Sequence, residues 1–354
     1  MALTDLWYMA LPSQRLARGR LVHVRLADHP IVFGRDAATG QAYALRDLCP
    51  HRGVPLSKGR LAEDGTIECP YHGWRFAGDG RCTAIPSLVP EQAFETERIR
   101  VRAYPVREQH GLIWVYLGAR PDAGPTANAE APEPPALPAL PADARPRHVE
   151  SMVFPCGIDH AVIGLMDPAH GPFVHRAWWW RAPKSIHAKQ KAFAPSPLGF
   201  TMVRHKPSAN SAAYKILRGE VSTEIAFRLP GVRIEHVQMD RPGKPAQHFV
   251  GLTAVTPVDD DHTVVHHAIY WTWPVLNLVR PVLPYFARTF LGQDRDVVAM
   301  QAEGLHDAPD LMLINDADVQ AKWYYRLKRE WQQARADGRP FKNPVDARVL
   351  RWQS

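Results

Sequence analysis

Two short loops near the N-terminus each carry one cysteine and one histidine. Residues 49–53 read CPHRG and residues 69–73 read CPYHG, so the four side chains follow the spacing C-x-H-x17-C-x2-H. Thiolate sulfur and imidazole nitrogen are both good metal ligands. Proline and glycine favour tight turns that bring neighbouring side chains to one side. The spacing therefore predicts one metal centre built from both loops.

The mixed composition of the loops separates two kinds of centre. Zinc sites usually pair cysteine with cysteine in one loop and histidine with histidine in the other. In a Rieske [2Fe–2S] cluster one iron takes both thiolates and the other takes both imidazoles, which suits two loops of mixed type. The pattern favours the cluster, with a structural zinc site as the alternative.

The loops resemble the Rieske domains of the ring-hydroxylating oxygenases in the stretches CPHRGVPLSKG and CPYHGWRF. The resemblance implies that Cys49, His51, Cys69 and His72 hold the cluster. Because neutral imidazoles replace two thiolates, the cluster is easier to reduce than an all-cysteine cluster. It would accept electrons from a ferredoxin or a flavin/iron–sulfur reductase. Trp74 is expected to pack rather than to carry electrons.

A second group of potential ligands lies in GLMDPAHGPFVH, where Asp167 precedes His170 and His175. Residues five apart in a regular helix diverge by about 140°, so both imidazoles reach one ion only where the helix is distorted. Gly171 and Pro172, or a π-type bulge, could supply the distortion. Two histidines and one carboxylate on one side of Fe(II) leave positions open for O2. The alternative is a solvated helix end.

This stretch resembles the iron motif D-x-x-H-x4-H of the oxygenase α subunits, which implies His170 and His175 as ligands of a mononuclear iron. The stretch LGQDRDVVAMQAEGL offers Asp294 and Asp296 for the third position. In the family a carboxylate stands here, ahead of a helix with the pattern E-D-x-x-V-V-E-x. Asp294 matches that pattern best, and Asp296 is the alternative.

The resemblance gives Asp167 a different role. In related enzymes the carboxylate at this place bridges to a histidine ligand of the neighbouring Rieske cluster, so Asp167 would hydrogen-bond His72 of the partner subunit in a cyclic homotrimer. The alternative is an ordinary acid at a helix end. Many relatives carry an Asn three or four residues earlier, where this chain has Gly164 and Ile163. Any role of that Asn is therefore not transferred to this chain.

The elements that must position these residues lie on two sides of one change in composition. Residues 121–149 are rich in proline and alanine, which predicts an extended connector. Residues 1–120 contain short β-rich runs bounded by Gly, Asp and Pro, which predict an N-terminal all-β Rieske domain. Residues 150–354 form the predicted catalytic domain of the mononuclear iron.

The predicted catalytic domain has mixed elements. Residues 247–273 read as a β-hairpin with a polar turn, and residues 292–304 and 316–337 carry helical patterns. The expected fold class is therefore α+β. The resemblance implies an antiparallel sheet of the helix-grip or START-like type in this domain.

Composition excludes several classes of protein. A chain of 354 residues with 45% hydrophobic residues buries a sizeable core and suits two domains. The net charge of +7 could attract an acidic redox partner, but dense basic runs interleaved with aromatics are missing from the sequence, so no nucleic-acid binding is expected. The four cysteines suit a reducing cytoplasm, with Cys82 and Cys156 as buried small residues.

Membrane insertion is not expected either. The N-terminus lacks the pattern of a secretory signal. The apolar stretch at residues 271–292 is interrupted by three prolines and two arginines, so no transmembrane segment is predicted and the expected location is the cytoplasm. The same stretch, and Trp178–Trp180, could instead line the substrate pocket, a subunit interface or a membrane-facing patch.

The two centres together predict a terminal oxygenase component of the monooxygenase type. Electrons would pass from the cluster through Asp167 to Fe(II), and O2 would be used to hydroxylate or oxidatively demethylate an organic substrate. Residues 200–290 show no obvious arginine clamp, which favours a mainly apolar, polycyclic or sterol-like substrate. The alternatives are an O-demethylase or hydroxylase of a small aromatic acid and, in another class, a Rieske electron-transfer protein without oxygenase activity.

Overall fold

The computed structural model describes residues 2–89, 91–92, 94–119, 132–175, 186–207 and 219–354. The chain divides into two compact units. The N-terminal unit holds Ala2–Ala136 and Pro141–Arg145, and the C-terminal unit holds Leu137–Leu140 and Pro146–Ser354. The predicted connector falls partly on residues 120–131, which lie outside the described residues.

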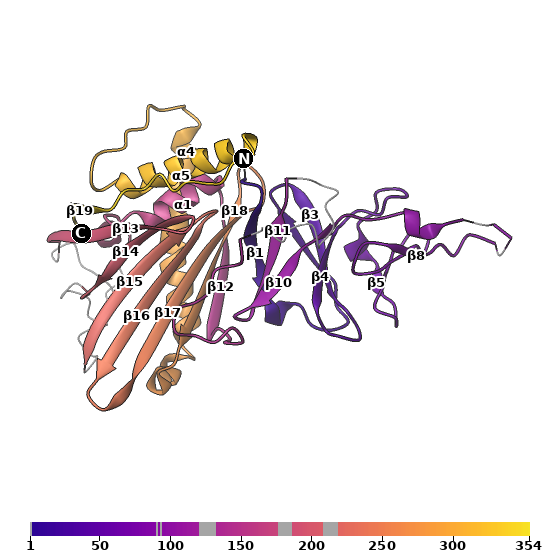
Figure 1. Ribbon diagram of the computed structural model, residues 1–354, viewed down its shortest axis with the longest axis horizontal. Coiled ribbons are helices and arrows are strands. Elements are labelled where there is room, and N and C mark those ends of the chain that lie inside the picture. The colour runs from indigo at the N-terminus through magenta and orange to yellow at the C-terminus, as the bar shows by residue number, and fades with distance from the viewer. Residues whose placement is uncertain (1, 90, 93, 120–131, 176–185, 208–218) are drawn as a thin grey trace. The chain divides into compact units, whose positions relative to one another are not determined.

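The N-terminal unit consists of three antiparallel sheets (Figure 1). Their orders are β1-β11-β10, β2-β3-β4-β9 and β5-β6-β7-β8. The strands are β1 Leu6–Pro12, β2 Val22–Leu26, β3 His29–Arg35, β4 Ala42–Arg46, β5 Arg60–Leu61, β6 Ile67–Glu68, β7 Arg75–Phe76, β8 Cys82–Ala84, β9 Ala103–Tyr104, β10 Val106–Gln109 and β11 Leu112–Leu117. Three short 3-10 turns accompany them, η1 Ser13–Arg15, η2 Leu56–Lys58 and η3 Thr96–Arg98.

The two cysteine–histidine loops of this unit rest on a shared apolar core. One loop lies between β4 and β5, and the other joins β6 to β7. Val32, Leu56, Ile67 and Phe76 pack beneath them in one buried cluster, together with both loop cysteines. Cys82 is buried in the same cluster, as expected. Both loops are therefore supported by the same apolar core.

The C-terminal unit is built on one eight-stranded antiparallel sheet of order β12-β18-β17-β16-β15-β14-β13-β19. Its strands are β12 His148–Phe154, β13 Ala188–Ser196, β14 Gly199–His205, β15 Glu220–Arg228, β16 Val232–Arg241, β17 Lys244–Pro257, β18 Thr263–Trp271 and β19 Arg348–Gln353. The helices among its described residues are α1 Ile158–Met166, α2 Gly171–Val174, η5 Pro274–Val279, α4 Leu283–Leu305 and α5 Val319–Ala336. The expected α+β class with an antiparallel sheet is confirmed.

The predicted hairpin at 247–273 corresponds to β17 and β18, which pair directly. Its turn is closed by the Asp259 carboxylate, which accepts hydrogen bonds from the backbone N–H groups of Asp261 (3.0 Å) and His262 (2.7 Å). Asp side chains commonly cap turns in this way. Cys156 just after β12 is buried, as expected, and its carbonyl accepts a hydrogen bond from the Thr263 hydroxyl (2.9 Å).

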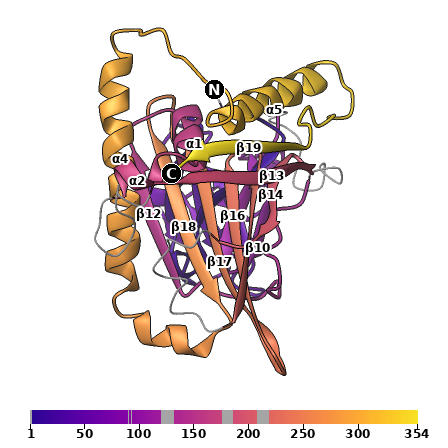
Figure 2. The same ribbon diagram turned by 90° about the vertical axis from the view of Figure 1, so that its left-hand side faces the viewer.

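Helix α4 packs one face against the sheet. Its buried residues Ala287, Leu291, Asp294 and Val298 recur every three or four positions, which places them on one side of the helix. Ala287 packs with Ile269 and Trp271 of β18. Figure 2 shows α4 running beside β12, which it also contacts. The side of α4 that carries Asp294 therefore faces the sheet.

Helix α4 begins nine residues before the predicted start at residue 292. The sequence places prolines in this region, but Pro284 lies in the first turn of α4, where a missing N–H breaks no helical hydrogen bond. The predicted helix at 316–337 is confirmed as α5, and its Trp323 packs against Phe193 and Phe200 of the sheet.

The stretch at 271–292 contains both buried and exposed apolar residues. Trp271 and Ala287 are buried, whereas Leu278 in η5 is 79% exposed. Within the described ranges, no helix combines the length and the apolar character needed to cross a bilayer. Trp178–Trp180 lie outside the described residues.

Candidate metal centres

The two loops of the N-terminal unit share one backbone geometry. In each, the cysteine N–H donates to the carbonyl five residues later, Cys49 to Val54 (2.9 Å) and Cys69 to Trp74 (2.8 Å). The glycine four residues after each cysteine donates back to the cysteine carbonyl, at 2.8 and 3.1 Å. Both glycines, Gly53 and Gly73, have φ near +70°, which other residues adopt only at a cost. The repeated spacing therefore reflects a repeated turn.

The ligand side chains of these loops gather at one place. The thiols of Cys49 and Cys69 are buried and form no disulfide. The imidazole rings of His51 and His72 lie 4.6 Å apart between centroids, and His51 is exposed. Trp74 stacks parallel to His51 at 4.6 Å, in agreement with a packing role. Solvent therefore reaches the centre from the side of the histidines.

Two observations fit an iron–sulfur cluster at this place. Among the described residues, the Nδ1 atom of His72 is buried without a hydrogen-bond partner, although a buried ring nitrogen normally has one. Burial also raises the pKa of the Cys49 thiol to about 11. A metal supplies the positive charge that a buried thiolate needs, and it supplies the missing partner of a histidine nitrogen. The residues present therefore suit the cluster.

The second centre lies where helix α1 ends. Asp167 has ψ near 120°, which ends the helix because the following Pro168 disfavours helical backbone before it. The chain then makes the single turn α2, with His170 just before it and His175 just after it. The expected distortion is present, but the helix ends before Pro168 and Gly171-Pro172 instead start α2. The two imidazoles are thereby turned toward each other.

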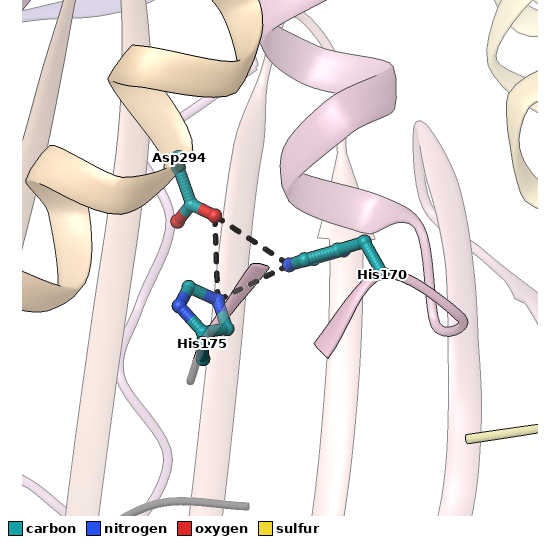
Figure 3. Close-up of side chains that lie close together, drawn as sticks. All are labelled: His170, His175 and Asp294. Carbon is teal, nitrogen blue, oxygen red and sulfur yellow. Dashed lines mark hydrogen bonds and ion pairs between the residues drawn. The ribbon is translucent and has the colours of Figure 1, made fainter. Parts of the chain in front are cut away.

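Asp294 of α4 completes a compact group of three ligand atoms (Figure 3). The Nε2 atoms of His170 and His175 are 3.2 Å apart. The Asp294 Oδ1 atom lies 3.5 Å from the Nε2 of His170 and 3.3 Å from that of His175. The structure thus brings together the three residues that the sequence predicted as iron ligands. Asp296 is 64% exposed and paired with Arg295, away from this group.

The positions of the N–H groups on the two imidazole rings favour a bound cation. The Nδ1 of His170 donates to the backbone carbonyl of Asp167 (2.8 Å), and the Nδ1 of His175 donates to the Oε1 of Gln293 (3.1 Å). In a neutral imidazole the other nitrogen then carries a lone pair. Two lone pairs and one carboxylate oxygen therefore face one another, and a metal ion satisfies all three.

The spacing of the three atoms suits a metal ion. Metal–nitrogen and metal–oxygen bonds are about 2.1 Å long, so three ligand atoms that lie 3.2–3.5 Å apart could all contact one ion. The three residues would hold such an ion from one side. This is the geometry of the two-histidine, one-carboxylate sites of non-heme iron oxygenases.

Burial shapes the electrostatics of this centre. Burial raises the pKa of Asp294 to about 7, and the positive charge of Arg233 opposes that shift. His175 is buried and its ring stacks on Phe290 at 3.8 Å. A bound cation would hold the Asp294 carboxylate in its charged form, because opposite charges stabilise each other strongly in a partly buried site.

Asp167 lies beside this centre without being one of its ligand atoms. One carboxylate oxygen accepts a hydrogen bond from the Ala169 N–H (2.7 Å), and the other lies 3.9 Å from the Nδ1 of His170. Burial raises the pKa of Asp167, although about a third of the side chain remains exposed. Its carboxylate is therefore adjacent to the candidate ligand His170 and still reachable from outside.

One functional residue was missed by the sequence interpretation. Gln293 precedes Asp294 in the sequence and has no role in the sequence analysis, yet its side-chain oxygen accepts a hydrogen bond from the His175 ring. A helix places adjacent residues about 100° apart, so nothing in the sequence indicates that both side chains serve one centre. The signal would have been a polar side chain next to a buried carboxylate.

Comparison with known proteins adds to these observations. Two family models match the chain, the Rieske [2Fe-2S] domain over residues 6–105 and the Vanillate O-demethylase oxygenase C-terminal domain over residues 164–331. The chain therefore carries a Rieske [2Fe-2S] domain followed by a C-terminal domain of the Vanillate O-demethylase oxygenase type. The Rieske match confirms the expected [2Fe–2S] cofactor, and the oxygenase-domain match agrees with a non-heme iron in the C-terminal unit.

Individual relatives are similar over parts of their length. A 4beta-methylsterol monooxygenase of Methylococcus capsulatus is 44% identical over 112 residues, which are 32% of this chain and 30% of that protein. A chloroplastic chlorophyllide a oxygenase of Chlamydomonas reinhardtii is 38% identical over 194 residues, 52% of this chain and 27% of that protein. The matched segments cover less than a third of the length of either relative.

Among solved structures, dicamba monooxygenase with non-heme iron and dicamba has a TM-score of 0.70 at 21% identity, and the match covers 96% of this chain and all of that one. This similarity establishes a common fold for the two chains. Some relatives carry chloroplastic names, so the cytoplasmic location stays a prediction.

Proposed function

We propose that the protein is the terminal oxygenase component of a Rieske monooxygenase system. It takes electrons from a ferredoxin or reductase and uses O2 to hydroxylate or oxidatively demethylate an organic substrate. The observation that carries the proposal is the convergence of His170, His175 and Asp294, whose lone pairs and charge face one another within 3.5 Å. A protein that only transfers electrons through its Rieske cluster would not need this second metal centre.

Different residues of the chain have different roles in the proposed reaction. Cys49, His51, Cys69 and His72 would hold the cluster, whose exposed histidine edge suits electron entry and exit. His170, His175 and Asp294 would hold Fe(II) on one side. When bound, the cluster supplies one-electron transfer and the iron supplies activation of O2. Gln293 and the Asp167 carbonyl fix the ring orientations of the two histidines.

Passage of electrons between the centres forms part of the proposal. Asp167 would accept a hydrogen bond from His72 of the partner subunit, which requires a head-to-tail ring of subunits and is proposed as a homotrimer. The partly exposed carboxylate beside His170 supports this role. A mainly apolar substrate, polycyclic or sterol-like, is favoured, and the name of the methylsterol monooxygenase relative is consistent with it.

The proposal is tested on purified protein by metal analysis and turnover. We expect three iron atoms and two sulfides per chain, and O2-dependent product formation with a surrogate reductase. His170→Ala should lose one iron and all turnover while the reduced Rieske signal in electron paramagnetic resonance persists. Asp294→Asn should lose the same iron, whereas Asp296→Asn should keep it, because Asp296 is exposed and paired with Arg295.

Other outcomes would point to other classes of protein. A colourless protein containing zinc would indicate a structural metal site. Retention of biological activity by His170→Ala would indicate a pure electron carrier. Turnover of small methoxylated aromatic acids alone would favour the O-demethylase alternative.

A further inference from the structure

The face of the large sheet that lies under α4 carries a row of polar side chains. Opposite residues in an antiparallel sheet point to the same side. Phe227 lies opposite Arg233, Arg233 opposite Thr253, Thr253 opposite His267, and His267 opposite Glu150. These five side chains, four of them polar, therefore cross five neighbouring strands on one face.

This face is the one directed at the proposed iron centre. Ile269 is two residues from His267 on β18, so both point to the same side. Ile269 packs against Ala287 of α4, which shares the buried side of that helix with Asp294. The charge of Arg233 also acts on the Asp294 carboxyl. Substrate bound at the centre would therefore meet this row.

The polar groups of the row are already matched with one another. Arg233 donates from Nη2 to a carboxylate oxygen of Glu235 (3.3 Å), the next residue on the same face of β16. The Thr253 hydroxyl hydrogen-bonds the Nδ1 of His267 (2.9 Å). Burial lowers the pKa of His267 to about 4, so its ring is neutral near pH 7. Its Nε2 is the nitrogen left for a ligand.

Among the described residues of this face, the charges of the row leave no surplus cation for an anionic ligand. Glu235 neutralises Arg233, and Glu150 adds a negative charge beside His148 (3.3 Å). Iron(II) held by one carboxylate contributes one net positive charge, which offsets Glu150. A carboxylate leaving water for this place would lose its hydration without gaining an unpaired partner.

Further cations of the sheet lie at a distance. Lys191 on β13 is three strands from β16, roughly 14 Å away, and its Nζ donates to the Lys206 carbonyl (3.2 Å). Arg241 is at the opposite end of β16 from Arg233, over the ring of Trp273. Neither can serve a ligand beside Arg233.

The row also offers space for a ligand. The sheet position between Glu235 and Ile269 is Gly251, where a Cβ would lie 3.5 Å from the Cε1 of His267. The side chains of Arg233 and Glu235 keep 27% and 29% of their surface exposed. A ligand can therefore reach Arg233 and Glu235, whereas Phe227 and Ile269 of the same face are buried against Tyr324 and Ala287.

We propose that the Arg233–Glu235 ion pair and the Thr253–His267 pair form the substrate-recognition row of this oxygenase. The row selects a neutral, mainly apolar substrate with a single hydroxyl, ether or carbonyl oxygen over a substrate with a carboxylate. His267 would hydrogen-bond the substrate oxygen through Nε2. The inference rests on the proposed function, because the row matters to substrate only if substrate binds beside the iron centre.

The test measures binding without turnover. The oxidised holoprotein, without reductase, is titrated by calorimetry with three matched pairs built on naphthalene, biphenyl and a steroid, such as 2-naphthylmethanol against 2-naphthoate. We expect at least one alcohol to bind about tenfold or more tighter than its carboxylate. Equal binding, tighter binding of the acids, or no binding of any ligand would overturn the proposal.

Two variants on opposite faces of the sheet make the test specific. Glu235→Gln frees the Arg233 charge and should shift the preference toward the carboxylate by about tenfold. Glu224→Gln is the matched control, because Glu224 is also 33% exposed and 3.9 Å from an arginine, Arg204, but lies on the other face, opposite His236. An unchanged preference in Glu235→Gln, or an equal shift in both variants, contradicts the proposal.

A third variant covers the case in which Glu235→Gln does not fold. Arg233→Gln leaves Glu235 unpaired and should weaken carboxylate binding further, so the ratio of alcohol to carboxylate affinity should rise. Tighter carboxylate binding contradicts the proposal. The proposed function is judged separately. If the binding preference is present but no ligand is turned over with reductase and O2, the oxygenase function fails while the recognition row stands.

Discussion

At the scale of single residues, both histidines of the second centre are oriented by a hydrogen bond on the side away from the ligand atom. His170 uses the backbone carbonyl of Asp167, which any residue at that position supplies. His175 uses the side chain of Gln293, which substitution can remove. Partners of this kind fix the tautomer and ring orientation of a metal-binding histidine. Substitution of Gln293 can therefore lower the metal affinity of the centre without changing a ligand residue.

We expect Gln293→Leu to weaken Fe(II) binding by roughly 10- to 100-fold, because the His175 Nδ1–H loses its acceptor. Competition with a calibrated chelator measures the change, and the Rieske spectrum should not alter. Gln293→Glu keeps an acceptor and should retain most of the affinity.

Gln301→Leu is the matched control for this prediction, since Gln301 is exposed on the same helix. Equal iron affinity in Gln293→Leu and Gln301→Leu would mean that Gln293 does not position His175.

At the scale of elements, α5 is tied to the chain that follows it by one ion pair. Arg339 donates two hydrogen bonds to the Glu330 carboxylate, at 2.6 and 3.0 Å, and the Lys342 N–H donates a third (3.2 Å). These bonds lower the pKa of Glu330 to about 2. Because α5 also packs on Phe193 and Phe200, this pair helps to hold the helix that covers one part of the sheet.

The pH dependence of this pair follows from the direction of its shift. A carboxyl group whose pKa is lowered by folding stabilises the folded state above its unfolded value, and this stabilisation is lost as the pH falls through the folded value. We therefore expect Glu330→Gln to lower the melting temperature at pH 7. The difference from wild type should shrink as the pH falls from about 4.5 toward 2.

Glu303→Gln on α4 serves as the control for the loss of one exposed carboxylate. A melting temperature of Glu330→Gln equal to that of Glu303→Gln at pH 7 would show that the ion pair contributes nothing.

At the scale of the whole molecule, the proposed activity depends on more than one chain. We expect the purified protein to sediment at three times 39.8 kDa. Asp167→Asn should preserve this mass and both metal contents, because an Asn oxygen still accepts from the Ala169 N–H. It should slow turnover by roughly tenfold or more, the size expected for the loss of one hydrogen bond to a charged group.

The rate at which the reduced cluster is reoxidised by O2 in the presence of substrate measures this step directly. Asp296→Asn is the control. A monomer with full turnover, or unchanged reoxidation in Asp167→Asn, would refute the bridging role of Asp167.

The sequence by itself predicted both candidate ligand sets, the second through a family resemblance that left Asp296 open beside Asp294. Cys49, His51, Cys69 and His72 lie in two short loops, and local turns are sufficient to bring such side chains together. Ligand chemistry permits few residue types, so spacing and type alone indicated the cluster. The hairpin and α5 were also predictable, because turn residues and periodic apolar positions are local signals.

Only the tertiary structure decided what lies around the second centre. The helix containing Asp294 begins earlier than its prolines suggested, and Gln293 reaches His175 through a fold contact 118 positions apart in the sequence. The polar row of Arg233, Thr253 and His267 comes from three separate strands, and it exists because the sheet order and register place them side by side. Turn geometry and the alternating hydrophobic pattern set the register of each strand pair, but the row itself appears only when all three strands are paired in one sheet.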